Sequence, residues 1–414
     1  MRLNPTAAAL VLLLTACGNS NSSNTTVREQ RGDTLVLSIR GGGTWGDAPQ
    51  LSPVASFGDA EGSDTVTLGQ IIALASGPDG RIFATDAQRL AVRVFDDSLT
   101  PLALWGRDGS GPAELRNPDG GLAVFSDGRV AVRDPGNARM QIFSPDGASA
   151  GEWRVVDAGL RTRDNFGLHG DTLLSRVVVK AEGPIDTWLY GLARIAPNGV
   201  VLDTAILPVV GSARQTLVAR RGNNTAELPL PFSASGLSAW HPFGGFATVV
   251  GDRYAITWPQ REGLLRVERE VEAVTVSDAE AAQERAYVTK GLQWLDPTWT
   301  WTGPEIPRTK PFVSQLFVGT DGSVWAVREG AAVDGDDPDF RPSDASSVER
   351  RLRSRLSFDV FSAAGEYLGA LDVPPGMQLR PQPVFTITSV IALALDDAGV
   401  PRLVRYRVET PAAR

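Results

Sequence analysis

The feature that most constrains this chain is an internal repeat. The segment from Leu104 to Trp153 aligns without a gap on the segment upstream of it, so that Asp134 corresponds to Asp86, 48 positions earlier. Each copy contains short β-branched and aromatic runs separated by Asp-Gly turns. Self-similarity at a period of about 40–50 residues is typical of propellers and other repeat arrays. We therefore expect an array of small antiparallel sheets.

The strand pattern predicts an all-β, six-bladed β-propeller of four-stranded antiparallel blades. Contiguous sequence from 70 to 373 supplies five blades, and the fourth of them is read from Gly244 to Ser277, with FATVV as its first strand and EAVTVS as its last. The sixth blade has too few strands, and an open sheet edge would expose unpaired backbone groups. Thr34–Arg40 alternates apolar and polar residues and has no blade of its own. We predict that this N-terminal strand pairs with Leu403–Val408 and closes the last blade.

Two segments interrupt the blades of the propeller domain, which is expected over 33–410. Ser277 and Glu280 form a capping box before an Ala-rich stretch, which predicts a surface helix over about 277–291, ended by Gly291. An insertion of about 330–355 separates the second and third strands of the fifth blade. It is first acidic and then rich in arginine.

The N-terminus is typical of a targeting signal rather than of a fold. Residues 7–14 are apolar, and residues 14–17 (LTAC) resemble the lipobox of bacterial lipoproteins, in which the cysteine is acylated. The resemblance implies a signal peptide over 1–17 and a lipid on Cys17 that anchors the mature protein in the cell envelope. An ordinary secretory signal with an incidental cysteine is the alternative. The polar residues 18–32 predict a flexible tether.

The first two blades carry a set of short motifs: a Gly-Pro lead-in at residues 111–118, an Asp-Gly-Arg turn at 127–129 and a strand at 137–143. With these motifs the two blades resemble the NHL repeat family, whose units have the same lead-in and turn and an Asn-Arg-Ile-Gln-Val-Phe strand. Over its whole length the chain looks like six-bladed, TolB-like propellers of bacterial envelopes. This resemblance implies the fold and no settled activity.

The charge of the chain narrows its partners. The net charge is −8 and the isoelectric point is about 5.1, which argues against the basic surface that nucleic acids require. We expect no nucleic-acid partner, no cofactor and a monomeric protein. The expected partners are the membrane and a protein or glycan.

Loop lengths predict which face of the propeller is functional. In a four-stranded meander, the first-to-second and third-to-fourth connections lie at one end of the blade, and all other connections lie at the other end. The long connections, residues 208–235, 277–311 and 330–355, are all of the second kind. We call the face that they form the loop-rich face, and we predict binding there because loops on a rigid scaffold commonly bind ligands.

The candidate binding residues of the loop-rich face are Trp240, His241, Trp294, Trp299, Trp301, Arg308 and Lys310. The tryptophans of the second long connection could stack on a sugar or partner loop, or could pin long loops to a sheet, and we favour packing. His241 could be a base or a metal ligand. Because the sequence has only two histidines and zinc sites need several N or S ligands, we expect neither role.

Charged residues in the insertion have a functional and a structural interpretation. Its aspartates could hold Ca²⁺, but they lack EF-hand spacing, so we favour a solvated acidic loop. Its arginines could bind an anionic headgroup, but we expect them to neutralise the neighbouring acidic run. These residues are Asp334, Asp336, Asp337 and Asp339, then Arg350, Arg351, Arg353 and Arg355.

One repeated charge is expected to be structural. Asp86 and Asp134 end the second strand of the first two blades. Catalytic groups are rarely repeated around a ring, so these residues are predicted to bond a turn or the next blade.

Two classes of function fit these observations. The first is a non-enzymatic, lipid-anchored scaffold that binds through its loop-rich face, and we favour it. The second is an enzyme at the channel mouth, since six-bladed relatives include gluconolactonase-type metal hydrolases and lyases. The sequence contains no G-x-S-x-G, H-E-x-x-H, P-loop or Rossmann motif, and it identifies no catalytic residue.

Overall fold

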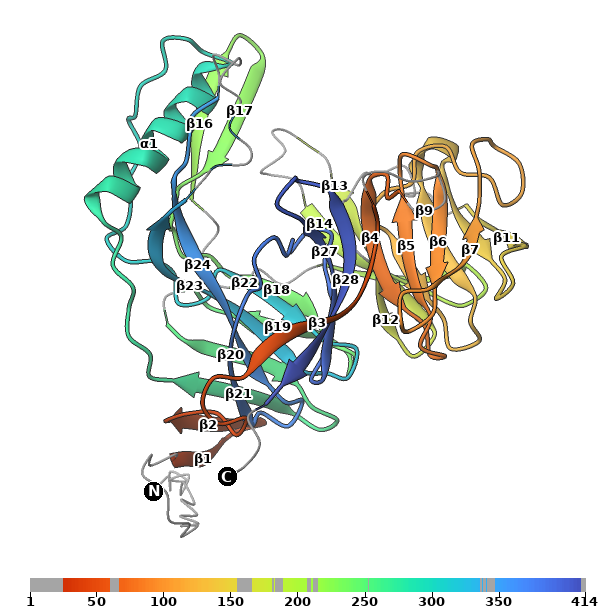
Figure 1. Ribbon diagram of the computed structural model, residues 1–414, viewed down its shortest axis with the longest axis horizontal. Coiled ribbons are helices and arrows are strands. Elements are labelled where there is room, and N and C mark those ends of the chain that lie inside the picture. Colours follow the sequence, from red (N-terminus) through yellow and green to blue (C-terminus); the bar gives the residue numbers. More distant parts are fainter. Residues whose placement is uncertain are drawn as a thin grey trace, which may run out of the picture.

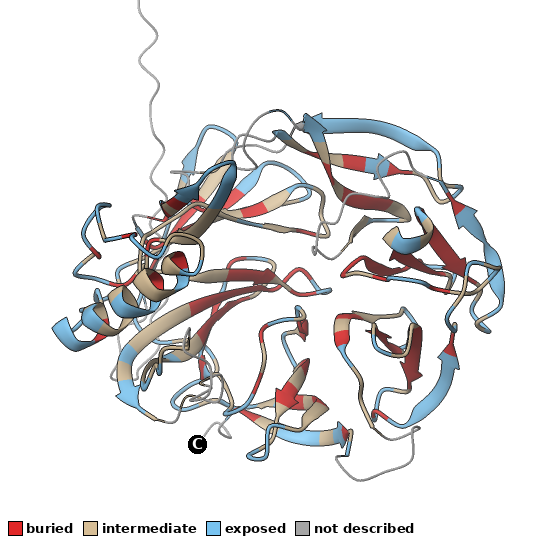
Figure 2. Ribbon diagram, turned by 90° about the horizontal axis from the view of Figure 1, so that it is seen from above, coloured by how far each residue is buried: buried red, intermediate tan, exposed pale blue. Residues whose placement is uncertain are grey.

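The computed structural model confirms the all-β, six-bladed propeller. It describes residues 25–59, 67–154, 166–180, 182, 189–206, 210, 215–251, 253–335, 337, 340 and 347–410. Six blades, each of four antiparallel strands, form a ring (Figure 1, Figure 2) around a central channel. Two further N-terminal strands extend the sheet of blade 4. Within the described ranges no helix is long and apolar enough to span a membrane.

Each blade begins with an inner strand at the channel and ends with an outer strand at the rim. Blades 1 to 3 consist of β4 (Ile71–Ser76), β5 (Ile82–Asp86), β6 (Ala91–Phe95) and β7 (Pro101–Trp105); β8 (Leu122–Val124), β9 (Val130–Asp134), β10 (Arg139–Phe143) and β11 (Ser149–Trp153); and β12 (Gly167–His169), β13 (Thr172–Lys180), β14 (Leu189–Ile195) and β15 (Val201–Ile206). A short 3-10 helix, Pro135–Asn137, follows β9.

Blades 4 to 6 consist of β18 (Leu237–Trp240), β19 (Phe246–Val249), β20 (Ala255–Pro259) and β21 (Leu264–Arg269); β22 (Gln315–Val318), β23 (Val324–Asp334), β24 (Leu352–Phe361) and β25 (Tyr367–Asp372); and β26 (Val384–Thr386), β27 (Ser389–Leu395), β28 (Pro401–Glu409) and β3 (Gln50–Phe57).

The strands of blades 1 and 2 lie where the repeat predicts them. Their middle strands are buried throughout, since both sides of each sheet pack against a neighbouring layer, whereas the outer strands β7 and β11 are exposed up to a terminal tryptophan. The ring of Trp105 lies 5.5 Å from Phe83 of its own blade and 6.0 Å from Phe143 of the next. The repeated tryptophan therefore seals the seam between blades 1 and 2.

The Asp-Gly-Arg turns also connect blades. Arg81 donates a hydrogen bond to the carbonyl of Pro145 in the next blade at 2.9 Å, and Arg129 does the same to Pro197 at 3.0 Å. Gly128 has a φ of 82°, a conformation that glycine adopts without strain. The turn motif is therefore a structural link repeated from blade to blade.

Asp134 has the predicted structural role. Its buried carboxylate accepts hydrogen bonds from the backbone of Arg116 at 3.1 Å and of Asn117 at 2.9 Å, and from the side chain of Asn137 at 2.7 Å. Asp86 likewise accepts from the backbone of Gly69 at 3.1 Å. Each aspartate thus fixes the lead-in to its own blade rather than a neighbouring blade.

An N-terminal strand closes the last blade, but the predicted strand is wrong. β3 pairs antiparallel with β28, with Ala55 opposite Arg405, and completes blade 6. Thr34–Arg40 forms β2, which pairs in parallel with β21 of blade 4. The physical reason is packing. Beside blade 4, Leu37 and Ile39 are buried in the apolar cluster that blades 4 and 5 share, whereas the outer position at blade 6 would have exposed them.

The N-terminal segment joins three blades in succession. β1 (Thr25–Arg31) pairs with β2 beyond the rim of blade 4, Trp45 donates a backbone hydrogen bond to Leu368 of blade 5 at 2.7 Å, and β3 ends in blade 6. The flexible tether predicted for 18–32 is wrong for residues 25–31, which form β1, and residues 18–24 lie outside the described residues. We call residues 25–57 the N-terminal lace.

From the sequence, the strands of blade 4 were assigned one position too early in the blade. Its inner strand is β18, so the segment FATVV is the second strand. The predicted outer strand, residues 272–277, forms only an isolated bridge from Thr275 to Thr309. The rim position is already filled by β21, with β2 beyond it.

Candidate functional site

The loop-rich face bears an accessory module. It consists of the helix α1 (Asp278–Gln293), the hairpin β16 (Thr216–Arg221) and β17 (Asn224–Pro229), and the ends of β23 and β24, all at the top of Figure 1. The predicted capping box is confirmed, with the Ser277 hydroxyl and the Glu280 carboxylate each bonded to the other's backbone N–H. The helix passes the predicted stop at Gly291 and ends two residues later.

The accessory module has an apolar core of its own. Leu217 of β16, Leu292 of α1 and Trp299 are buried in one cluster. The indole of Trp299 donates to the carbonyl of Val218 at 3.0 Å, so the packing role expected for this tryptophan is found. Trp301 packs against the edge of the cluster with Arg285 4.6 Å from its ring centroid.

Lys310 joins the accessory module to blade 5. Its buried ammonium lies 2.7 Å from the Glu280 carboxylate, 2.8 Å from the Gly330 carbonyl and 2.9 Å from the Ser354 hydroxyl. Burial alone would raise the pKa of Glu280, but the bonds from Lys310 and Ser277 hold that pKa below its ordinary value. Lys310 therefore has a structural role, although the sequence analysis placed it among the candidate binding residues.

Two other candidate residues remain available on the module. Trp294 is 77% exposed, so the packing role does not extend to it. Arg308 is exposed in the connection that follows α1. Both lie on the loop-rich face, where the sequence placed them.

His241 lies on the opposite face, which corrects the sequence prediction. Because β18 is an inner strand, the turn from His241 to Gly245 is a first-to-second connection. The Nδ1 of His241 accepts from the Phe243 backbone at 3.2 Å, and its Nε2 lies 3.1 Å from the Gly322 carbonyl of blade 5. Burial lowers the pKa of His241. Both ring nitrogens of His241 are thus engaged, and its side chain links blade 4 to blade 5.

The charged insertion is mostly self-neutralised. Arg351 lies 3.0 Å from Asp334, and Arg353 pairs with Asp337. Arg350 stacks 4.2 Å from the Tyr287 ring centroid. Asp336 and Asp339 lie outside the described residues, and so does Cys17. Among the residues that are described, no three His, Cys, Asp or Glu side chains gather as metal ligands would.

The insertion extends β23 and β24 into a paired arm that α1 holds. The two strands remain paired from Ala332 opposite Ser354 to Asp334 opposite Leu352. The amide of Gln283 makes two hydrogen bonds of 2.8 Å with the backbone of Leu352. The ends of the predicted 330–355 excursion are therefore strand rather than loop.

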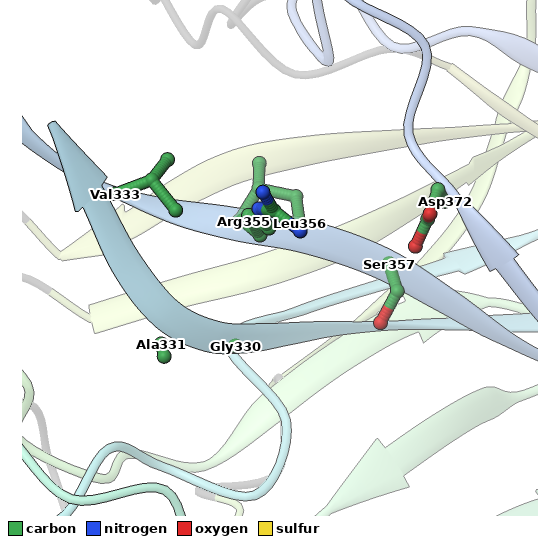
Figure 3. A pocket seen from close by; sticks show the side chains of 7 residues that line it. All are labelled: Gly330, Ala331, Val333, Arg355, Leu356, Ser357 and Asp372. Atoms are coloured by element: carbon green, nitrogen blue, oxygen red, sulfur yellow. The ribbon is translucent and has the colours of Figure 1, made fainter. Parts of the chain in front are cut away.

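A shallow groove of about 450 Å³ lies beside this arm. Figure 3 shows Arg355, Leu356 and Ser357 of β24 facing it, with Asp372 at the end of β25. Arg355 is exposed and makes no ion pair within the described ranges, so the self-neutralisation predicted for the arginines does not include it. The groove offers one cation and one carboxylate to solvent.

A larger cavity of about 1060 Å³ occupies the centre of the ring. All six blades line it, and one lining residue from each blade in turn is Leu74, Leu122, Leu168, Trp240, Leu316 and Phe385. The Trp240 indole donates to the Leu168 carbonyl at 2.9 Å, which ties blade 4 to blade 3. Trp240 is thus a channel residue rather than a residue of a long connection.

The lining becomes polar toward the loop-rich face. Inner strands run away from that face, so residues that precede or start them lie at its end of the channel. There the cavity is lined by Gln70, Asn117, Asp119 and Gln315. Arg133 holds both Asp119 oxygens at 2.7 and 2.9 Å, and burial raises the pKa of Asp119. These channel residues were missed from the sequence, because they occupy unpatterned lead-ins that only ring closure brings together.

No family model matches the chain, and no curated protein matches it. Among solved structures, it is similar to an exported-protein candidate from Bacteroides fragilis (TM-score 0.45, 10% identity, covering 90% of this chain and 99% of that one). It is also similar to a member of the DUF4221 family from Bacteroides vulgatus (TM-score 0.47, 7% identity, 88% and 98%). A third similar structure is virginiamycin B lyase from Staphylococcus aureus (TM-score 0.34, 9% identity, 87% and 100%). These similarities are distant, so the function must be inferred from the chain's own residues.

Proposed function

We propose that this protein is a lipid-anchored scaffold of the bacterial cell envelope that binds a partner through its loop-rich face. The main support is the placement of the two ends of the molecule. β1 and β2 lie at the bottom of Figure 1, whereas α1, β16 and β17 lie at the top. Thr25 follows Cys17 by eight residues, which span at most about 28 Å. A lipid on Cys17 would keep β1 near the membrane and turn the loop-rich face away from it.

The exposed groups of that face support a binding role. Trp294 is 77% exposed at the end of α1, and large exposed aromatic residues are common anchors in interfaces. The central cavity supplies a concave surface of mixed polarity. Kinship with NHL and TolB-like propellers is part of the same proposal, supported by the Asp-Gly-Arg turns of blades 1 and 2.

The test uses the absence of any cysteine other than Cys17 from the sequence. Arg308→Cys places a single thiol on the loop-rich face, and Ala150→Cys places one on the exposed rim strand β11. Both variants are treated with a membrane-impermeant maleimide in native envelopes and again after detergent extraction. We expect extraction to raise labelling at position 308 at least threefold and to leave position 150 unchanged. Equal labelling of position 308 in both states would refute the proposal.

A second candidate is an enzyme at the channel mouth, and Asp119 is the observation that favours it. This carboxylate lines the channel, and burial raises its pKa, as in many catalytic acids. Its two bonds to Arg133 favour a structural role instead. Metal analysis of the purified domain separates the scaffold from the enzyme. One equivalent of bound Ca²⁺ or Zn²⁺ in the wild type that is lost in Asp119→Asn would support a metal-dependent hydrolase at the channel mouth.

A further inference from the structure

Blade 6 carries a bulge that projects into the channel. Gln378 bonds to Leu393 at 2.8 Å and Val384 pairs with Ile391, so five inner residues stand opposite the single residue Ala392 of β27. All five residues, 379–383, line the central cavity. Two of them, Arg380 and Gln382, are exposed. A bulge of this kind re-aims side chains at the expense of regular pairing.

Arg380 gives this part of the channel a positive charge. It makes no ion pair or side-chain hydrogen bond among the residues that the structure describes, whereas the channel carboxylate Asp119 is held by Arg133. Arg176 adds a second cation from blade 3, across the ring from blade 6. The guanidinium of Arg176 is engaged, since it stacks 4.3 Å from the ring centroid of Tyr190, so Arg380 is the cation that this part of the channel offers to a ligand. An exposed arginine in the channel of a chain of net charge −8 favours an anionic ligand.

The neutral polar groups narrow the chemistry of that ligand. Gln70, Asn117 and Gln382 line the channel and are exposed, and Gln315 is half-buried; no side-chain hydrogen bond is formed by any of them within the described ranges. An amide offers both donors and an acceptor. Hydroxyl groups use both, whereas a phosphate uses donors alone.

The apolar lining adds a third element. Trp240 and Phe166 line the same cavity, and aromatic faces pack well against the C–H faces of sugar rings. A cavity of about 1060 Å³ is large enough for a short oligosaccharide, since pockets for drug-sized ligands occupy roughly 300–1,000 Å³.

From these groups we infer that the channel binds an acidic oligosaccharide, with Arg380 holding a carboxylate and the channel amides holding hydroxyl groups. The guanidinium fork matches a carboxylate in two parallel hydrogen bonds. This inference rests on the proposed binding function and names its ligand class.

The test is calorimetric titration of the soluble domain, residues 25–410, with trigalacturonate and with its methyl ester. The ester retains every hydroxyl group and lacks the charges. We expect the acid to bind at least tenfold more tightly than the ester, and Arg380→Gln to abolish that difference. The matched control is Arg261→Gln, an exposed arginine in a turn on the opposite face, which should leave both affinities unchanged.

Three results would overturn the inference: equal affinity for acid and ester, unchanged binding by Arg380→Gln, or no binding of either saccharide at millimolar concentration. Arg380→Gln must retain the wild-type melting temperature, and Gln70→Ala should weaken acid and ester alike by several-fold. Failure here leaves the labelling of Arg308→Cys as an independent test of binding through the loop-rich face.

Discussion

Blades 1 and 2 are held together differently from blades 4 to 6. In blade 2 the buried carboxylate of Asp134 accepts hydrogen bonds from residues 3 to 18 positions away. In blade 5 the buried carboxylate of Asp359 accepts from Tyr254 and Arg269 of blade 4, 105 and 90 positions away. The contacts that hold blades 1 and 2 together come from residues within each repeat. Blades 4 to 6 instead depend on segments that are distant in the sequence, above all on the N-terminal lace.

The largest expected effect comes from removing the lace in two steps. A domain that begins at Gly43 lacks β1 and β2 but keeps β3, and we expect it to fold with a lower melting temperature. A domain that begins at Gly58 also lacks β3, which leaves the edge of β28 unpaired, and exposed edges promote association. We expect loss of cooperative unfolding and aggregation in gel filtration. Cooperative unfolding of the shorter domain would show that β3 is dispensable for closure.

The next effect concerns the buried cluster between blades 4 and 5. Asp359 lies 2.9 Å from Arg269 and accepts from Tyr254 at 2.8 Å and Tyr367 at 3.0 Å. Burial and the Asp359 charge raise the pKa of both tyrosines, so they remain neutral donors. Asp359→Ala leaves Arg269 nearly buried without its partner, and we expect a loss of about 3–5 kcal/mol in urea unfolding. A loss below about 1 kcal/mol would contradict the role of this cluster.

A smaller and more local effect is expected at Asp134. Asp134→Ala leaves two backbone N–H groups unbonded, at a cost of about 2–3 kcal/mol. Hydrogen exchange should accelerate at Arg116 and Asn117 and remain unchanged in blades 4 to 6. Asp359→Ala should accelerate exchange in blades 4 and 5 together. Equal spreading in both variants would remove the contrast between the two regions.

The smallest expected effect is a pH dependence of stability that arises only in blades 4 and 5. Blades 1 to 3 are linked at their turns by Arg81 and Arg129, whereas blades 4 and 5 are linked by His241. The folded pKa of His241 lies below its ordinary value, near 6.5 when unfolded. Below about pH 6.5 the unfolded chain binds a proton that the folded chain does not, so stability falls by at most about 1.4 kcal/mol per pH unit.

The contribution of His241 can be separated from that of the carboxylates. The difference in unfolding free energy between wild type and His241→Gln should be constant above about pH 6.5 and should shrink as the pH falls toward the folded pKa. A difference that grows on acidification would mean that the folded state takes up the proton.

The fold was predictable where the chain repeats itself. The strands of blades 1 and 2 and the cap at Ser277 follow from local patterns that the structure confirms. β18 was not predicted from the sequence, because the turn that follows it, from His241 to Gly245, lacks the Asp-Gly signature. The hairpin of β16 and β17 was not predicted either, although the apolar residues Leu217 and Ala219 alternate with others before a turn at Gly222, whose φ is 60°.

The closure and the channel could be predicted only in part. The need for an N-terminal strand follows from counting strands, but the choice between β2 and β3 depends on burial against blade 5. Pro53 within β3 was a usable signal, since proline in a sheet favours an edge strand. Arg380 carries no local signal, because its place in the channel results from a bulge whose two ends pair with β27.

The most direct test of the account asks where the loop-rich face lies relative to the membrane. The lipidated protein is placed in vesicles that contain acceptor-labelled lipid, and a donor dye is attached either to Arg28→Cys on β1 or to Arg308→Cys on the loop-rich face. We predict efficient energy transfer from position 28 and weak transfer from position 308. Equal transfer from both positions, or stronger transfer from position 308, would contradict an anchor that turns the loop-rich face away from the membrane.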